Sequence, residues 1–358
     1  MNWIKAYNMR LIFFYPIYLI FIIIFILEVV FRIAPTSSPV DLSPVTSSSD
    51  VLRYKPYQTS TFSLGANFYK VIEKSTNNYG FFSSIDYEPN SSPDIMVIGD
   101  SYVEAVQVKN EDSFPEVISK KNKGKIVYQL GIPGVALSQY IQMIKFSEKE
   151  FSPTHYIITI VGNDFDESLC KYKQKLGTWC YDKNFKLIFI PFEGYSFKRS
   201  MARKSSFLRY LVFNLNLNWR VVLKKIGLND EGLRADIQYA GNTERVKPEN
   251  IKKESMKVID HFFEEITNLG IHEKITLVLD ADRQDIYMNN NSSSYFRDMR
   301  EYLIKNAFLK KINIIDMEPI FKIDFNQNKK IFEFPTDAHW NEHAHELVAQ
   351  TFINQHHE

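Results

Sequence analysis

The sequence predicts an α/β protein, with a central parallel sheet of about five strands between two layers of helices. Short apolar runs recur along the chain, and the stretches between them have helical patterns. The runs that we expect to form strands lie near residues 94–99, 126–130, 155–161, 274–280 and 312–316. This alternation favours a parallel sheet with helices on both faces. The chain has 358 residues, 45% of them hydrophobic, so it is long enough to bury one large core or two modest ones.

The N-terminal segment is expected to form one transmembrane helix that precedes this fold. Leu11 to Leu27 contains no charged residue, and the apolar stretch continues past Glu28 to Phe31, which gives a span close to bilayer length. A cleaved signal peptide is the alternative. The run is long for one, and Pro35 directly after Ala34 makes a poor cleavage site.

The charges around this helix predict its orientation. Lys5 and Arg10 precede the apolar run, together with the amino terminus, and only Glu28 and Arg32 follow it closely. Positive charge favours the cytoplasmic side, so residues 1–33 should be a cytoplasmic tip and anchor, with the rest of the chain outside the cytoplasm.

A linker is expected to follow the anchor. Residues 34–60 include a stretch, Pro35 to Asp50, that is rich in Ser, Pro and Thr and nearly free of charge. This composition is typical of a flexible tether. It would join the anchor to a domain at 61–358.

Ser101 is the candidate nucleophile, because it ends the sequence Gly99-Asp100-Ser101 directly after an apolar run. A serine hydroxyl needs a histidine to accept its proton, and the histidine needs a carboxylate that fixes its tautomer. Asp337 and His339, near the other end of the chain, supply both groups. Taken alone, Gly-Asp-Ser is a turn tripeptide, so its significance depends on two segments that lie between these residues.

Those segments carry candidate donors for an oxyanion hole. Gly134 follows the second apolar run and can present a backbone N–H that no side chain covers, and Asn163 follows the third run and carries a neutral amide donor. Each also has a purely structural interpretation, since glycines at strand ends serve turns and asparagines there cap helices. Ser101, Gly134 and Asn163 would share the carboxyl edge of the sheet, where ligands bind in such folds.

With serine, glycine, asparagine and histidine in this order, the chain resembles the SGNH branch of the GDSL hydrolases over roughly residues 77–355. The resemblance implies a three-layer, flavodoxin-like fold and an ester hydrolase that needs no cofactor. It also implies that Ser101 is nucleophile and first oxyanion donor, that Gly134 and Asn163 are further donors, and that His339 is the base, oriented by Asp337.

The sequence departs from the family pattern at two places. Val161 stands where the family has a glycine two residues before the asparagine, although Gly162 is adjacent. The acid Asp337 and the base His339 are two residues apart instead of the commoner three. Residues i and i+2 of an extended segment point to the same side, so this pair can still meet.

Two later segments are predicted to be helices. Residues 248–269 carry an apolar stripe at helical spacing that ends at Gly270, and the stretch after His339 resembles the closing helix of the family. We expect His343 and His345 to be surface residues of that last helix. No metal site is predicted, because no Cys-x-x-Cys or His-Glu-x-x-His spacing occurs.

Residues 165–245 interrupt the strand–helix alternation and are expected to form a lid or subdomain, because they are too long for an ordinary connection. This insertion contains the only cysteines, Cys170 and Cys180, which fit one disulfide in an oxidising compartment or, alternatively, two reduced thiols. It is aromatic-rich and basic, with 13 Lys or Arg against 4 Asp or Glu in 165–225, although the whole chain has a net charge of +1. The basic residues form either a solvated face or a surface for an acidic glycan or an anionic membrane.

These observations predict a membrane-anchored, extracytoplasmic serine esterase or O-acyltransferase, periplasmic in a Gram-negative source. Its substrates would be acyl esters of cell-envelope carbohydrate, and nucleic acid is disfavoured as a partner of an exported domain. A lipid esterase is the enzymatic alternative, favoured by the anchor and the aromatic insertion. A glycan-binding or assembly module that keeps the fold without catalysis is a hypothesis from a different class.

Overall fold

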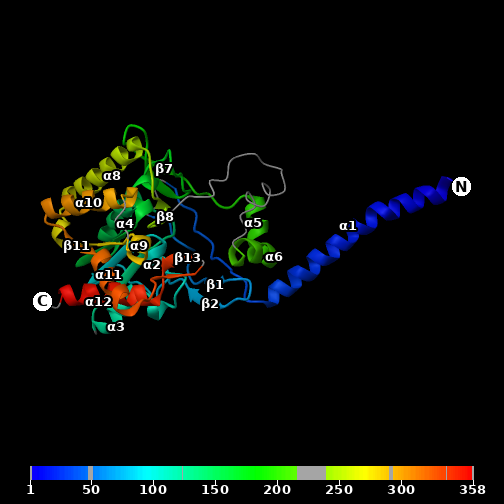
Figure 1. Cartoon of the computed structure of the whole chain (residues 1–358), viewed down its shortest axis with the longest axis horizontal. Helices are drawn as coiled ribbons and strands as arrows, with labels where there is room; N and C mark the ends of the chain where they lie inside the picture. Colours follow the sequence, from blue (N-terminus) through cyan, green and yellow to red (C-terminus); the bar gives the residue numbers. More distant parts are fainter. Residues whose placement is uncertain are drawn as a thin grey trace. The chain divides into compact units, whose positions relative to one another are not determined.

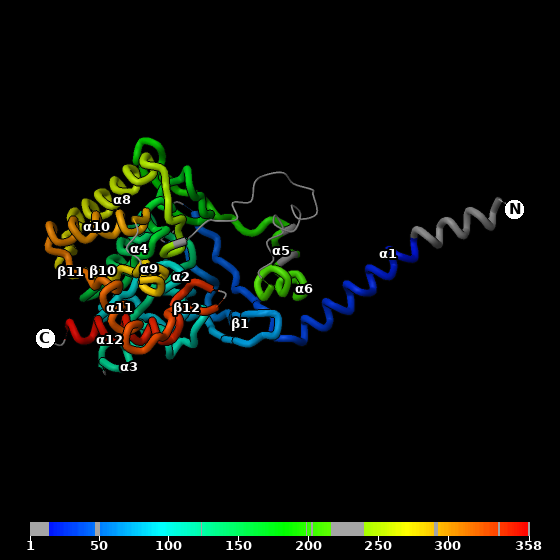
Figure 2. The backbone as a smooth tube through the Cα atoms, viewed as in Figure 1, coloured from blue at the N-terminus to red at the C-terminus, as the bar shows by residue number. Residues whose placement is uncertain are grey.

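The structure is a computed structural model that describes residues 2–46, 51–122, 124–215, 239–289, 293–335 and 337–356; Figure 2 traces the backbone. The chain divides into two compact units. Unit 1 consists of Met1–Pro39, Ser60–Glu73 and Tyr195–Leu233, and unit 2 consists of Val40–Thr59, Lys74–Gly194 and Arg234–Glu358.

A five-stranded parallel sheet forms the centre of unit 2, with the strand order β11-β10-β5-β3-β4. The strands are β3 (Ile95–Gly99), β4 (Val127–Gly131), β5 (His155–Ile160), β10 (Ile275–Leu279) and β11 (Asn313–Asp316). They coincide with the five predicted runs to within about a residue at each end. Strands β3, β4 and β10 are buried at every position, as expected for a parallel sheet covered on both faces, which is why the sequence shows continuous apolar runs.

Helices cover both faces of this sheet (Figure 1). On one face α3 (Phe114–Lys121) packs against α12 (Glu342–His356), and α11 (Met317–Asn328) packs against α12 and α9 (Arg283–Met288). On the other face α8 (Glu249–Asn268) packs against α4 (Leu137–Glu150) and α10 (Tyr295–Leu309). The predicted three-layer α/β fold is therefore confirmed. The helix expected at 248–269 is α8, and Gly270 after it has a positive φ of 69°.

Shorter elements complete unit 2. They are the helix α2 (Ser101–Glu104), the hairpins β6–β7 (Thr178–Tyr181 and Leu187–Ile190), β8–β9 (Tyr239–Ala240 and Thr243–Glu244) and β12–β13 (Glu333–Phe334 and Asp337–Trp340), and the 3-10 turns η1 (Asn110–Asp112), η2 (Gly162–Asp164), η3 (Asp166–Ser168) and η5 (His272–Lys274).

Unit 1 contains the N-terminal helix α1 (Asn2–Ile33), most of the hairpin β1–β2 (Thr59–Leu64 and Lys70–Ser75), and the helical segments α5 (Phe197–Lys204), α6 (Ser206–Arg209) and η4 (Tyr210–Asn214). Within α1, residues Phe14–Ile33 have a mean hydropathy of 2.6 and are long enough to cross a membrane, a criterion that a signal sequence also meets.

The predicted insertion at 165–245 does not form one body. Residues 165–194 belong to unit 2, and residues 195–233 belong to unit 1 together with α1. Its basic residues Arg220, Lys224 and Lys225 lie outside the described residues.

The segment expected to be a flexible tether is instead packed where it is described. Val45 and Leu52 are buried, and the backbone of Val45 exchanges hydrogen bonds with that of Phe192. Both side chains lie against Gly177 of the predicted insertion. Although this segment is rich in Ser, Pro and Thr, its few apolar residues pack against residues that are distant in the sequence.

The expectation for His345 is also wrong, because α3 packs over this side of α12. The His345 side chain is buried, and its Nδ1 accepts a hydrogen bond of 3.3 Å from the Phe114 backbone N–H. Burial, with the nearby charges of Lys74 and His339, lowers the pKa of His345 to about 3. His343 is only partly buried, and its Nε2 lies 2.6 Å from a carboxylate oxygen of Asp324.

Candidate active site

The structure brings Ser101, His339 and Asp337 together at the carboxyl edge of the sheet. Ser101 is the first residue of α2, directly after β3, and Asp100 caps this helix by accepting a 2.9 Å hydrogen bond from the Tyr102 backbone N–H. The Ser101 Oγ lies 2.7 Å from His339 Nε2, and His339 Nδ1 lies 2.5 Å from Asp337 Oδ1. These contacts form the hydrogen-bonded chain that a serine nucleophile requires.

Asp337 and His339 contact each other at a spacing of two residues because both lie on strand β13. Asp337 Oδ1 accepts one hydrogen bond from the backbone N–H of His339 at 2.9 Å and contacts its Nδ1 as well. The carboxylate therefore fixes both the backbone and the ring of His339. Gln107 donates a further hydrogen bond to Asp337, a contact that the sequence did not reveal.

The electrostatics of the pair favour a charged acid and a basic histidine. Burial alone raises the pKa of Asp337, but the hydrogen bonds and charge of His339 outweigh it, and the net pKa lies below the ordinary value. Burial alone lowers the pKa of His339. The hydrogen bond and charge of Asp337 act in the opposite direction, as do the charges of Asp100 and Glu104, and the net pKa of His339 is raised above its ordinary value.

A buried polar network supports the strand that carries His339. The Trp340 indole N–H donates to Asp280 Oδ1 at 2.9 Å, and the Tyr102 hydroxyl donates to the backbone carbonyl of Ala338 at 3.1 Å. Arg283, also buried, donates to the Tyr102 hydroxyl at 2.8 Å. Asp280 and Arg283 follow β10, and Tyr102 lies on α2, so the network ties β13, which carries His339, to the central sheet. Sequence reasoning missed them, although the polar run Asp280-Ala281-Asp282-Arg283 directly after a predicted strand was a usable signal.

Gly134 lies in a left-handed conformation with a φ of 66°. A Cβ atom built at this position would lie 3.0 Å from Lys173 Nζ, and the neighbouring Lys175 donates a hydrogen bond to the carbonyl of Pro133. A larger residue here would strain the backbone and displace a lysine, so glycine keeps this loop close to the two cations.

Asn163 lies in η2, directly after β5, and its side chain is buried. One amide N–H donates to Glu167 Oε2 at 2.9 Å, and Glu167 also forms an ion pair with Lys173. An amide nitrogen has two N–H groups, and this contact uses one of them. The Asn163 Oδ1 is buried and has no hydrogen-bond partner within the described ranges of the chain.

Gly162 lies in the turn after β5, where another backbone segment approaches closely. A Cβ at Gly162 would lie 2.6 Å from the carbonyl oxygen of Gly241 and 2.8 Å from that of Ala240, so only glycine fits between these backbones. The turn is further held by Asp164, whose carboxylate accepts a 2.8 Å hydrogen bond from the Val161 backbone N–H.

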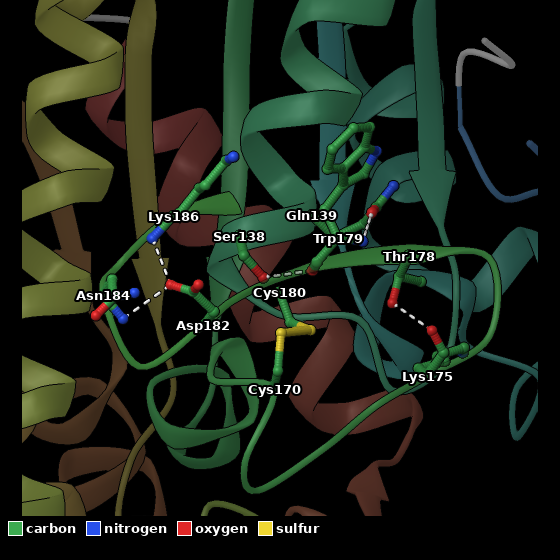
Figure 3. The surroundings of a disulfide bond; sticks show 10 residues. All are labelled: Ser138, Gln139, Cys170, Lys175, Thr178, Trp179, Cys180, Asp182, Asn184 and Lys186. Atoms are coloured by element: carbon green, nitrogen blue, oxygen red, sulfur yellow. Dashed lines mark hydrogen bonds between the residues drawn. A yellow bond between two sulfur atoms is a disulfide. The ribbon is translucent and has the colours of Figure 1, made fainter. Parts of the chain in front are cut away.

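A disulfide between Cys170 and Cys180 closes the loop that carries Lys173 and Lys175 (Figure 3). The strand after this loop is held by Ser138, whose hydroxyl donates to the carbonyl of Trp179 at 2.8 Å. The pairing agrees with the even cysteine count, and it joins the two ends of the loop whose lysines lie beside Gly134.

The lysines of this loop are not a free basic face. Lys171 pairs with Glu254, Lys173 pairs with Glu167, and Lys175 is bound to a carbonyl. Burial lowers the pKa of Lys175 to about 8 and raises that of nearby Glu104 to about 7. In this part of the insertion, each of these three lysines is engaged by another group of the protein, and the exposed Lys171 forms its ion pair at the surface.

Among the described residues no group of three or more His, Cys, Asp or Glu side chains is arranged to hold a metal ion.

Comparison with known proteins finds matches among solved structures. No protein-family model matches the chain, and no curated protein matches it. Of 31 matching chains, one is a lipolytic protein of the G-D-S-L family from Veillonella parvula DSM 2008, with 12% identity, 73% of this chain and 96% of that chain covered, and a TM-score of 0.40. An acetyl xylan esterase, AlAXEase, has 12% identity, coverage of 73% and 98%, and a TM-score of 0.40.

A lipase/acylhydrolase from Enterococcus faecalis matches with 12% identity, coverage of 73% and 94%, and a TM-score of 0.38. Likeness at this level carries no argument about the activity of this chain. The case for its function rests on the geometry of Ser101, His339 and Asp337.

Proposed function

We propose that unit 2 is a serine ester hydrolase or acyltransferase of the SGNH type. The observation that carries this proposal is the hydrogen-bonded chain from Ser101 Oγ through His339 to Asp337 at the carboxyl edge of a parallel sheet. Such an arrangement activates a serine hydroxyl and requires no cofactor.

In the proposed mechanism, Ser101 Oγ attacks the acyl carbonyl carbon while His339 Nε2 takes the hydroxyl proton. The carbonyl electron pair moves onto oxygen, and the tetrahedral intermediate then collapses with cleavage of the ester C–O bond. His339 returns the proton to the leaving alcohol, and the acyl group stays on Ser101. Water or a sugar hydroxyl, deprotonated by His339, attacks the acyl group and restores the serine.

The negative oxygen of the intermediate needs donors, and we assign them to the backbone N–H groups of Ser101 and Gly134 and to the second amide N–H of Asn163. Glu167 holds the Asn163 amide through its other N–H. A carboxylate near a developing oxyanion would oppose catalysis, but Lys173 pairs with Glu167 and offsets its charge. We therefore assign Glu167 and Lys173 as positioning residues.

The substrate class that we propose is an acyl ester of cell-envelope carbohydrate. Support comes from the apolar helix α1, which suits an anchor, and from the disulfide, which is typical of an oxidising compartment outside the cytoplasm. A lipid esterase is the second candidate, favoured by the same apolar helix, because an anchored enzyme is concentrated next to lipid.

Reaction with a fluorophosphonate probe tests the proposed activity. The probe should attach covalently to Ser101 in the full-length protein, because the activated hydroxyl displaces fluoride at phosphorus. Mass spectrometry of the labelled peptide identifies the residue. A protein that resists the probe at every concentration while retaining its fold would instead be a binding module. If the probe reacts, a panel of acetyl and longer acyl esters with and without sugar acceptors separates hydrolysis from transfer, and carbohydrate from lipid substrates.

The pH dependence should report His339. The base must be neutral to accept a proton, so kcat/KM should rise with pH through the pKa of His339, which is raised above the ordinary value of about 6.5. Asp337→Asn removes the charge that raises this pKa and should move the acidic limb to lower pH while it reduces kcat. The measurement is the pH profile of kcat/KM for both proteins.

Glu104→Gln is the matched control for this profile, because burial raises the pKa of Glu104 to about 7, into the same pH range. Of the groups that raise the pKa of His339, Glu104 contributes least, so the control should move the acidic limb to lower pH by less than Asp337→Asn does. If the limb stays unchanged in Asp337→Asn and disappears in Glu104→Gln, then His339 is not the group that limits activity at low pH.

A further inference from the structure

The last turns of α1 are built into the fold of unit 1. The Glu28 carboxylate accepts hydrogen bonds from Ser205 Oγ at 2.8 Å, from the Ser206 backbone N–H at 3.0 Å and from the Phe207 backbone N–H at 3.1 Å. Arg32 donates to the same carboxylate at 3.0 Å. A carboxylate in a membrane span is costly unless it has partners, and here the start of α6 supplies them.

Aromatic contacts reinforce this junction. The Phe31 ring stacks on Tyr210 with centroids 4.0 Å apart and on Phe207 at 5.8 Å. Thr36 Oγ1 donates to the carbonyl of Phe31 at 3.1 Å. A helix whose end forms part of a folded unit is expected to be retained, whereas a signal peptide is removed without loss to the fold.

The junction sets the depth of α6 relative to the membrane. Glu28 lies within the candidate span Phe14–Ile33, five residues before its end, which corresponds to about 7.5 Å along a helix that rises 1.5 Å per residue. The beginning of α6 is therefore held near the boundary between hydrocarbon and headgroups.

The helical segments α5, α6 and η4 of unit 1 expose apolar side chains. On α5, Phe197 and Met201 are one helical turn apart and are 81% and 54% exposed. Leu208, Val212 and Phe213 are also exposed. Clustered exposed apolar side chains mark an interaction surface, and their position beside a membrane span indicates lipid as the partner.

Basic residues accompany these apolar side chains, and neither α5 nor α6 contains an acidic residue. The guanidinium groups of Arg199 and Arg203 lie over the Tyr195 ring, at 5.3 and 4.4 Å from its centroid, and Lys204 follows them. A short basic helix with exposed Phe and Met side chains is typical of a segment that lies in the interface of an anionic membrane. An acidic glycan would match the charge but would offer nothing to the apolar side chains.

We propose that α5 and α6 lie in the interface of the membrane that α1 crosses, with Phe197 and Met201 in the acyl-chain boundary and the basic residues on anionic lipid headgroups. This inference rests on the proposed anchoring by α1 and is independent of the ester chemistry at Ser101. The segment would hold unit 1 against the bilayer on the side where α1 leaves it.

The test uses the full-length protein with Met201→Cys, labelled by an environment-sensitive fluorophore and reconstituted into phosphatidylcholine vesicles with or without phosphatidylglycerol. Asn184→Cys, in the exposed turn between β6 and β7, is the matched control. Lipids that carry a spin label near the headgroup quench a fluorophore at the interface. We expect at least threefold stronger quenching at Met201 than at Asn184 in vesicles with phosphatidylglycerol.

Other results complete the test. Weaker quenching at Met201 without phosphatidylglycerol, or in Arg199→Gln/Lys204→Gln, would support headgroup recognition. Equal quenching in both lipids would overturn that recognition, and quenching at Met201 no stronger than at Asn184 would overturn the interfacial location. Release of the protein from the vesicles by alkaline carbonate would show that α1 does not anchor it. The enzymatic proposal is tested separately, by the reaction of Ser101 with the fluorophosphonate probe. Circular dichroism of each variant establishes that it is folded.

Discussion

Ser101→Ala and His339→Ala should each reduce kcat for a small acyl ester by a factor on the order of 10⁴ to 10⁶, because the nucleophile and its base act as one unit in forming the acyl-enzyme. For the same reason the double variant should lose no more activity than either single variant. The fold should survive both changes, since each removes side-chain atoms at the edge of the sheet and leaves its buried strands intact. Kinetics with p-nitrophenyl acetate and thermal unfolding measure the two effects.

The Ser101→Ala preparation also serves as the control for contaminating esterases, because any activity that it retains comes from elsewhere. If this variant hydrolyses the ester at a rate close to that of the wild type, and the activity copurifies with the protein, then Ser101 is not the nucleophile. Independent, multiplicative losses in the double variant would show that Ser101 and His339 do not share one mechanism.

Asn163→Ala should lower kcat by about 10² to 10³-fold with little change in KM, as expected for a donor that acts mainly on the charge of the transition state. Its buried amide already has one N–H on Glu167, at 2.9 Å, so the side chain is oriented before substrate arrives. Steady-state kinetics of the wild type and the variant separate the two constants.

Glu167→Gln is the matched variant, because its amide oxygen can still accept the Asn163 hydrogen bond after the charge is gone. It should lose less than tenfold in kcat, an expectation that follows from keeping the donor in place. Lys173→Met leaves the Glu167 carboxylate without its ion pair and should be worse than Glu167→Gln, and the double variant should recover part of the loss. A change confined to KM in Asn163→Ala would place this residue in substrate binding.

The strands and the main helices could be predicted from the sequence because their signals are local. Each buried strand appears as an apolar run, and the stripe at 248–269 repeats at the period of a helix. The carboxyl ends of parallel strands lie at the same edge of a sheet. Residues that directly follow such strands, such as Ser101 and Asn163, could therefore be expected to lie near one another from the sequence alone.

The surroundings of the site depended on contacts between residues distant in sequence. Glu167, Lys173 and Gln107 are ordinary polar residues in the sequence, and only the folded chain sets them beside Asn163, Gly134 and Asp337. His345 illustrates the same point, since a helix position is buried or exposed according to the helix packed against it.

The sequence by itself determined the α/β fold class, the order of the candidate catalytic residues, the apolar N-terminal helix and the cysteine pair. The tertiary structure alone decided how Asp337 and His339 meet at a two-residue spacing, which charges flank the proposed oxyanion donors, and that part of the basic insertion folds with the N-terminal helix. The reason is physical: apolar patterning acts over neighbouring residues, whereas the pairing of charges and the burial of polar groups are set by the partners that folding brings within hydrogen-bonding distance.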